Sequence, residues 1–162
     1  MRTYNFIAFL IFFVCPFING QTSQLDSMVN ESLVAFIKER KEQFCKRTDI
    51  GVDDYFKNLY LLIDNLPRDF QFCKQLQDMQ LPFFSLTNPN TKKMKKGEKY
   101  IVIFTDISLI NNQLKIILSD KRVTYIKSNH LNIAISDWGE YFYEYSCDGK
   151  KWQLVDTKYG GI

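Results

Sequence analysis

Alternating apolar and polar positions dominate the back half of the chain. Residues 100–109 place apolar or β-branched side chains at every second position, namely Ile101, Ile103, Thr105, Ile107 and Leu109. Residues 113–119 repeat this alternation, and Asn111 and Asn112 between the two stretches tolerate the positive φ angles of a tight hairpin turn. The pattern predicts two antiparallel strands, and the second strand has the option of continuing to about residue 125.

A second long alternation covers residues 131–147. It favours one strand bent at Gly139, and the alternative is two strands joined by a tight turn there. Asp148-Gly149 is the strongest hairpin sequence in the chain, and residues 151–156 return as a final strand. These stretches together predict a curved antiparallel β-meander with one apolar face, which another element has to cover.

Helical periodicity marks the segment 21–47. Apolar side chains recur there at helical spacings and form one stripe, made of Leu25, Val29, Leu33, Phe36, Ile37 and Phe44. The opposite side carries glutamates and lysines and is expected to face solvent. Between this helix and the meander, residues 59–63 and 83–84 predict a short buried strand and an edge strand.

The expected fold class is therefore α+β, with an N-terminal amphipathic helix packed on a curved antiparallel β-meander. By architecture this is analogous to the cystatin-like and NTF2-like folds. Fold analogy of this kind does not determine function.

Residues 1–20 have the layout of a secretory signal peptide. Arg2 gives the positive start, residues 6–13 form the apolar stretch, and small residues close the segment. The apolar stretch is too short for a transmembrane segment. We therefore expect an exported protein, periplasmic or secreted, with a single α+β domain over residues 21–162.

Lipid anchoring through Cys15 is the less favoured alternative, because Val14 before it fits a lipoprotein cleavage site poorly. The chain has 21 basic and 18 acidic residues and a formal net charge of +3. This balance, together with export, argues against nucleic acid as a partner.

Three cysteines remain after the leader, and in an oxidising compartment two of them are expected to pair. Cys147 lies on the apolar face of its predicted strand and is expected to be a buried thiol. Cys45 and Cys73 are therefore the favoured pair among the three possible pairings.

Four aromatic residues form the candidate ligand-binding pocket: Trp138, Tyr141, Tyr143 and Tyr145. An aromatic-lined concave sheet is one way to hold a small apolar ligand. The same side chains also suit a solid core under the helix, and the sequence leaves both interpretations open.

No catalytic motif, metal-ligand set or cofactor motif is visible, and His130 is the single histidine. The sequence therefore favours a non-catalytic binding or interaction module for a small apolar ligand or a protein partner. One alternative is an inhibitor or immunity-type protein. Another is a small hydrolase or isomerase that uses carboxylates in a sheet cavity, for which the candidates are Asp64, Asp106, Asp137 and Glu144.

The C-terminal quarter carries one resemblance. Residues 137–139, 143–147 and 152–155, with the tail 158–162 and the leader, resemble a group of small uncharacterised exported proteins of Gram-negative bacteria. The resemblance implies export, and it brings no activity and no site residues.

Overall fold

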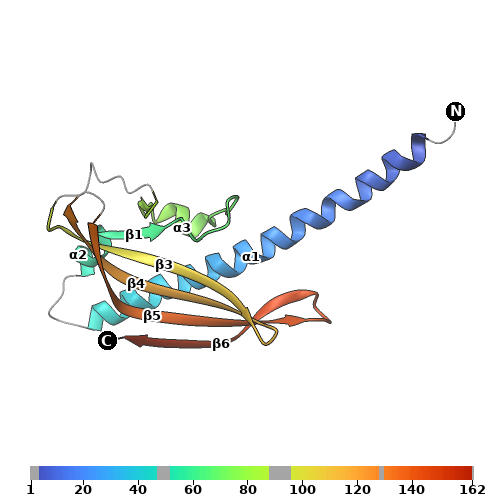
Figure 1. Cartoon of the computed structure of the whole chain (residues 1–162). Coiled ribbons are helices and arrows are strands. Elements are labelled where there is room, and N and C mark those ends of the chain that lie inside the picture. Colours follow the sequence, from blue (N-terminus) through green and yellow to red (C-terminus); the bar gives the residue numbers. More distant parts are fainter. Residues whose placement is uncertain (1–3, 47–51, 88–95, 128–129, 162) are drawn as a thin grey trace.

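The computed structural model describes residues 4–46, 52–87, 96–127 and 130–161. Within these ranges the chain forms a mixed α+β structure (Figure 1). Its elements in chain order are α1 (Tyr4–Lys46), α2 (Val52–Lys57), β1 (Leu59–Leu62), α3 (Lys74–Asp78), β2 (Phe83–Phe84), β3 (Lys99–Ile110), β4 (Gln113–Lys127), β5 (His130–Ser146) and β6 (Lys151–Gly161).

The described strands form one open, mostly antiparallel sheet with the order β2-β1-β3-β4-β5-β6. β1 runs parallel to both β2 and β3. The four long strands pair antiparallel in sequence order, which confirms the predicted meander. The short strands at residues 59–63 and 83–84 are also confirmed, and they extend the sheet on one side.

The hairpin turns lie where the sequence places them. Asn111 and Asn112 have φ angles of 51° and 63° and join Ile110 to its partner Gln113. Lys150 has a φ angle of 49° and follows Asp148-Gly149 in the turn between β5 and β6. β4 continues to Lys127, so the longer of the two options for that strand is the correct one.

β5 is a single strand, as the favoured interpretation of residues 131–147 expects, but its irregularity lies elsewhere. Gly139 pairs regularly with Leu118. The register shift falls three residues earlier, because Asp120 pairs with Asp137 while Lys121 pairs with Ile135, which leaves residue 136 without a partner on β4. Such an extra residue bends a strand locally, and Figure 1 shows β4 and β5 curving near this end of the sheet.

Gly139 has a packing reason instead of a bulge. A Cβ atom at this position would lie 3.1 Å from Phe36 Cδ2 and 3.1 Å from the ring of Tyr159. The missing side chain therefore lets the ring of Phe36 on α1 sit directly against the backbone of β5.

α1 covers one face of the sheet, as its apolar stripe predicts. Val29, Leu33 and Phe36 are fully buried, and they pack in one cluster with side chains from β1, β3, β4 and β5. Ile37 and Phe44 complete the buried stripe. Figure 1 shows that α1 runs along the sheet and that its N-terminal half projects beyond it.

The opposite face carries a second, smaller apolar cluster near the β1 side of the sheet. Its buried members are Leu62, Phe84, Tyr100, Val102, Phe104 and Val123. β3 therefore buries side chains on both faces. This agrees with its interior position in the sheet and with its nearly continuous apolar sequence.

The expected Cys45–Cys73 disulfide is not formed, and Cys45, Cys73 and Cys147 are free thiols. The amide N–H of Cys73 donates a 2.8 Å hydrogen bond to the side-chain oxygen of Asn30 on α1. Cys45 lies four turns further along this helix, a separation of about 22 Å at 1.5 Å per residue. A disulfide needs Cα atoms within about 7 Å. Cys147 is exposed at the end of β5, so the expectation of a buried thiol is also wrong.

No helix in the described ranges has both the length and the apolar character needed to cross a membrane.

One buried polar atom lacks a partner among the described residues. Thr105 is fully buried, and its hydroxyl oxygen makes no hydrogen bond. Because an unsatisfied buried hydroxyl costs free energy, we expect Thr105→Val to raise the free energy of unfolding by about 1 kcal/mol. Urea unfolding followed by circular dichroism measures this change. A loss of stability of similar size would mean that the hydroxyl has a partner in solution.

Candidate functional site

Two of the four aromatic residues predicted to line a pocket, Tyr141 and Tyr143, are instead packed in the core. Tyr141 and Tyr143 are each 1% exposed and pack against the buried stripe of α1. The hydroxyl of Tyr143 lies 2.9 Å from that of Ser32 and donates a 3.1 Å hydrogen bond to the carbonyl of Met28. These two tyrosines are part of the core and fasten the sheet to the helix.

Trp138 and Tyr145 do not join them. Trp138 lies on the opposite face of the sheet, where a Cβ atom on Gly160 would come within 2.4 Å of its ring. Tyr145 is 48% exposed and contacts Trp152 edge to face, at 5.6 Å between ring centroids. The four side chains therefore line no common cavity. For Trp138 the sequence alone contained the reason, because residues 138 and 141 differ by an odd number and point to opposite faces of a strand.

A buried charge cluster holds the C-terminal part of α1 on the sheet. Arg40 is 3% exposed and donates from Nε to Asp120 Oδ2 at 3.0 Å and from Nη2 to Asp137 Oδ2 at 2.5 Å. The Tyr55 hydroxyl donates to the same Asp120 oxygen at 2.7 Å. The other oxygen of Asp120 accepts the backbone N–H of Asp137 at 2.9 Å.

The electrostatics of this cluster are those of a paired ion. Burial lowers the pKa of Arg40, but the carboxylates of Asp120 and Asp137 outweigh this, and the net shift is upward. Burial and the neighbouring charge of Asp120 raise the pKa of Tyr55. Arg40 and Tyr55 therefore keep their protons at neutral pH.

The four candidate carboxylates of the sequence do not meet. Asp137 binds Arg40, whereas Asp64 accepts hydrogen bonds from Ser85, Leu86 and Thr87 in an exposed loop. Asp106 lies near the Asn65 amide, and Glu144 accepts from Gln113 on the exposed side of β4. Desolvation raises the pKa of Asp64, but the hydrogen bonds from the loop outweigh this effect. The net pKa of Asp64 therefore lies below the ordinary value of an aspartate.

Asp120 is an important acidic residue that is absent from the four carboxylates predicted from the sequence. Its position contained a signal, because it continues the alternation of Ile116 and Leu118 on the buried face of β4. All three are 0–1% exposed. A charged residue in phase with a buried apolar face requires a buried partner, and Arg40 on the facing helix is that partner.

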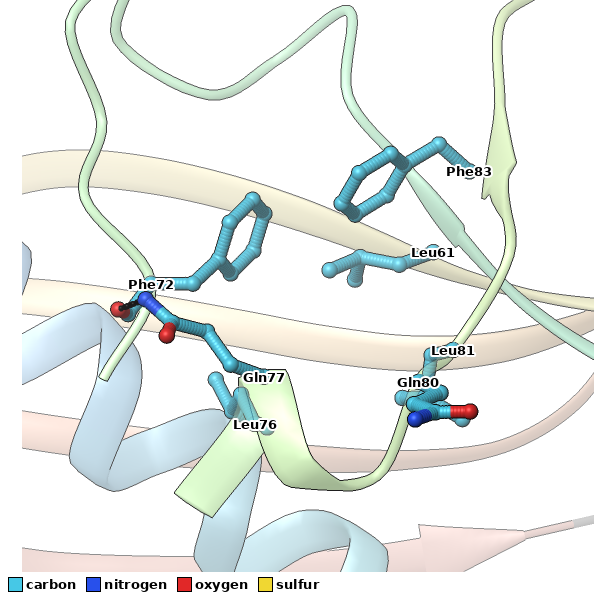
Figure 2. A pocket seen from close by; sticks show the side chains of 7 residues that line it. All are labelled: Leu61, Phe72, Leu76, Gln77, Gln80, Leu81 and Phe83. Atoms are coloured by element: carbon cyan, nitrogen blue, oxygen red, sulfur yellow. Dashed lines mark hydrogen bonds between the residues drawn. The ribbon is translucent and has the colours of Figure 1, made fainter. Parts of the chain in front are cut away.

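A hollow of about 300 Å³ lies beside α3, and two of its lining residues, Leu61 and Leu76, belong to the same buried cluster as the stripe of α1. Its walls are mainly apolar, and two glutamine amides stand among them, as Figure 2 shows. The residues that line it are Leu61, Phe72, Leu76, Gln77, Gln80, Leu81 and Phe83. Phe72 and Phe83 stack, with 5.2 Å between ring centroids and 19° between ring planes.

Hydrogen bonds from α1 fix the wall that carries Phe72. The Asn30 amide donates to the carbonyl of Gln71 at 2.8 Å, and its oxygen accepts the N–H of Cys73 at 2.8 Å. The amide of Gln77 donates to the carbonyl of Phe72 at 2.6 Å. Gln80 has a φ angle of 50° and follows the end of α3, a position where a left-handed residue is common.

A second, more open hollow of about 550 Å³ lies on the far side of Phe72, between α1 and α3. Its lining combines polar side chains, among them Asp26, Asn30, Glu31 and Gln75, with apolar surface from residues that include Val34 and Phe72. Its width and mixed lining make it a surface groove and not a defined ligand site.

The part of the chain that the structure describes contains no group of three or more histidine, cysteine, aspartate or glutamate side chains placed to hold a metal ion. In the described residues the fold thus defines a small α+β protein with a helix packed on its sheet and an apolar depression at the edge of that sheet. Comparisons with protein-family models, with curated proteins and with solved structures gave no match.

Removing the cation from the buried cluster leaves two carboxylates without their partner. We expect Arg40→Met to lower the free energy of unfolding by about 3–5 kcal/mol. Lys38→Met is the matched control, because Lys38 is exposed on the same helix, and its effect is expected within about 0.5 kcal/mol. Chemical denaturation measures both variants. Equal effects of the two substitutions would contradict the role assigned to Arg40.

Three buried tyrosines make the protein sensitive to alkali. Burial raises the pKa of Tyr55, Tyr141 and Tyr143, so the unfolded chain loses these protons near pH 10 while the folded chain keeps them. The stability is therefore complete below this pH and falls as the pH rises above it. Absorbance at 295 nm is expected to show that at least these three of the nine tyrosines ionise only on unfolding. Ionisation of all nine in the folded protein would contradict this.

Proposed function

We propose that this protein is an exported, non-catalytic binding module that holds a small apolar ligand in the hollow beside α3. The observation that carries the proposal is the hollow lined by Phe72, Leu76 and Phe83. The middle of the sheet face is not the proposed binding site, since the buried stripe of α1 packs there.

Size and chemistry of the hollow support a small ligand. Its volume of about 300 Å³ is at the lower end of the range for small-molecule sites. Phe83 is 57% exposed, an unusually open position for an aromatic ring at the mouth of an apolar depression. The amides of Gln77 and Gln80 add a small number of polar groups, which is the usual way to orient an apolar ligand.

The wall of the hollow is held before any ligand arrives. The two hydrogen bonds from Asn30 to residues 71 and 73 fix the segment that carries Phe72. A site that needs little ordering on binding loses less conformational entropy.

The two other functions considered from the sequence have weaker support. A carboxylate-based hydrolase or isomerase needs its acidic groups together in the sheet cavity. Asp64, Asp106 and Glu144 instead form their hydrogen bonds on the exposed surface, and Asp137 binds Arg40. An inhibitor or immunity-type protein needs an exposed acidic or aromatic surface, and no observation on the described residues favours this function. We also propose that the architecture is cystatin-like or NTF2-like, because proteins of these folds place a helix on a curved sheet.

N-phenyl-1-naphthylamine, an uncharged apolar dye, tests the hollow. We expect its fluorescence to rise on binding to the protein and Phe83→Ser to weaken its affinity by about tenfold, the equivalent of about 1.4 kcal/mol. The aromatic wall of the site is then lost, while the fold keeps its core. Ile110→Ser is the matched control, because Ile110 is also an exposed strand residue, at 52%, and lies away from the hollow.

Equal affinities for the wild type, Phe83→Ser and Ile110→Ser would overturn the proposed site.

The mass of the protein purified after expression of the full chain tests export, since removal of the leader is expected to leave Gln21 at the N-terminus. An uncleaved chain in the cytoplasm would overturn that part of the proposal.

A further inference from the structure

The outer edge of β5 is only partly covered. β6 pairs with β5 from Asp137 to Ser146, although β5 begins at His130. Residues 131–136 therefore lie beyond the end of β6, and in the described part of the chain no other strand pairs with this side of them. A strand edge of this kind presents backbone N–H and C=O groups to any other strand that approaches.

Two other edges, β2 and β6, carry the usual protection against such pairing. β3 beyond Ile103 has no partner on its β1 side in the described chain, and this stretch carries Asp106. β2 is only two residues long and follows Pro82. β6 carries Lys151, Asp156 and Lys158, and its register shifts between the partners of Phe142 and Tyr143, so that Val155 is unpaired. Short length, charge, proline and bulges all discourage strand pairing.

Residues 131–135 in the free part of β5 have none of these devices, and the bulge lies at residue 136, next to the end of β6. Residues 131–135 read Leu-Asn-Ile-Ala-Ile and contain no charged residue and no proline. Ile133 is 41% exposed and Ile135 is 54% exposed. Leu131 packs against the cluster on the face away from α1, and alternation places Ile133 and Ile135 on that same face.

We propose that a second copy of this chain pairs with this edge, antiparallel and two-fold symmetric, so that the sheets of two molecules become continuous. The segment is complementary to itself. Pairing about Ile133 places it opposite Ile133 of the second copy and places Leu131 opposite Ile135. All of these side chains then lie on one face, where they extend the buried cluster around Val123, and the uncharged sequence brings no like charges together.

The contact is limited to one short strand and its apolar side chains. Its area falls in the class of small interfaces that support weak association. A dimer that forms reversibly with concentration is therefore the expected state, independent of any ligand in the hollow beside α3.

Sedimentation velocity tests the pairing on protein purified after expression of the full chain. From roughly 1 μM to 1 mM, we expect the wild type to shift from monomer to dimer. Ile133→Lys places two lysines opposite each other at the axis and is expected to weaken the dimer by about tenfold or more. Leu109→Lys is the matched control, because Leu109 is 65% exposed on β3, away from this edge, and it is expected to dimerise like the wild type.

Hydrogen exchange gives a readout that does not depend on a variant. The amides of residues 131–135 are expected to become protected as the wild-type concentration rises, while the exposed amides near Leu109 do not change. A wild type that stays monomeric over the whole range would overturn the proposal. So would a dimer that forms without protection of residues 131–135, or one that Ile133→Lys and Leu109→Lys weaken equally.

Discussion

The packing of α1 along one face of the sheet is the constraint on which the rest of the structure depends. Residues 24–44 of the helix span about 30 Å, and residues 137–146 of β5 also span about 30 Å. One helix is therefore long enough to cover this face from end to end. Phe36 fits against Gly139, and Tyr143 bonds to the helix backbone at Met28. These contacts join the two layers directly.

A buried ion cluster fixes the direction and register of this packing. Apolar side chains tolerate small shifts of a helix on a sheet, because their attraction has little directionality. Arg40 does not tolerate such shifts, since it has to meet Asp120 and Asp137 together, at 3.0 Å and 2.5 Å. A helix displaced by one turn would leave two carboxylates buried without a cation, which is far more costly than a displaced methyl group.

The surfaces proposed for recognition consequently lie at the periphery of the sheet. The apolar hollow lies between α3 and the strands β1 and β2. The uncovered strand edge lies at residues 131–136 of β5. The two sites are on different edges and use different chemistry, one an apolar depression and the other backbone hydrogen bonding. Occupation of one does not require a change in the other.

The sequence by itself determined the long helix, the strands of the meander and the fold class, because periodicity and turn residues are local properties. The helical stripe around Leu33 and the asparagine turn at residues 111 and 112 are examples. The sequence did not indicate α2 or α3, and β6 runs on to Gly161, past its predicted end at residue 156. Tertiary structure alone decided that Asp120 meets Arg40, that Cys45 and Cys73 are held far apart, and that Phe72 and Phe83 form a hollow. Each of these pairs is distant in the chain, and only the docking of one element on another fixes the distance between its members.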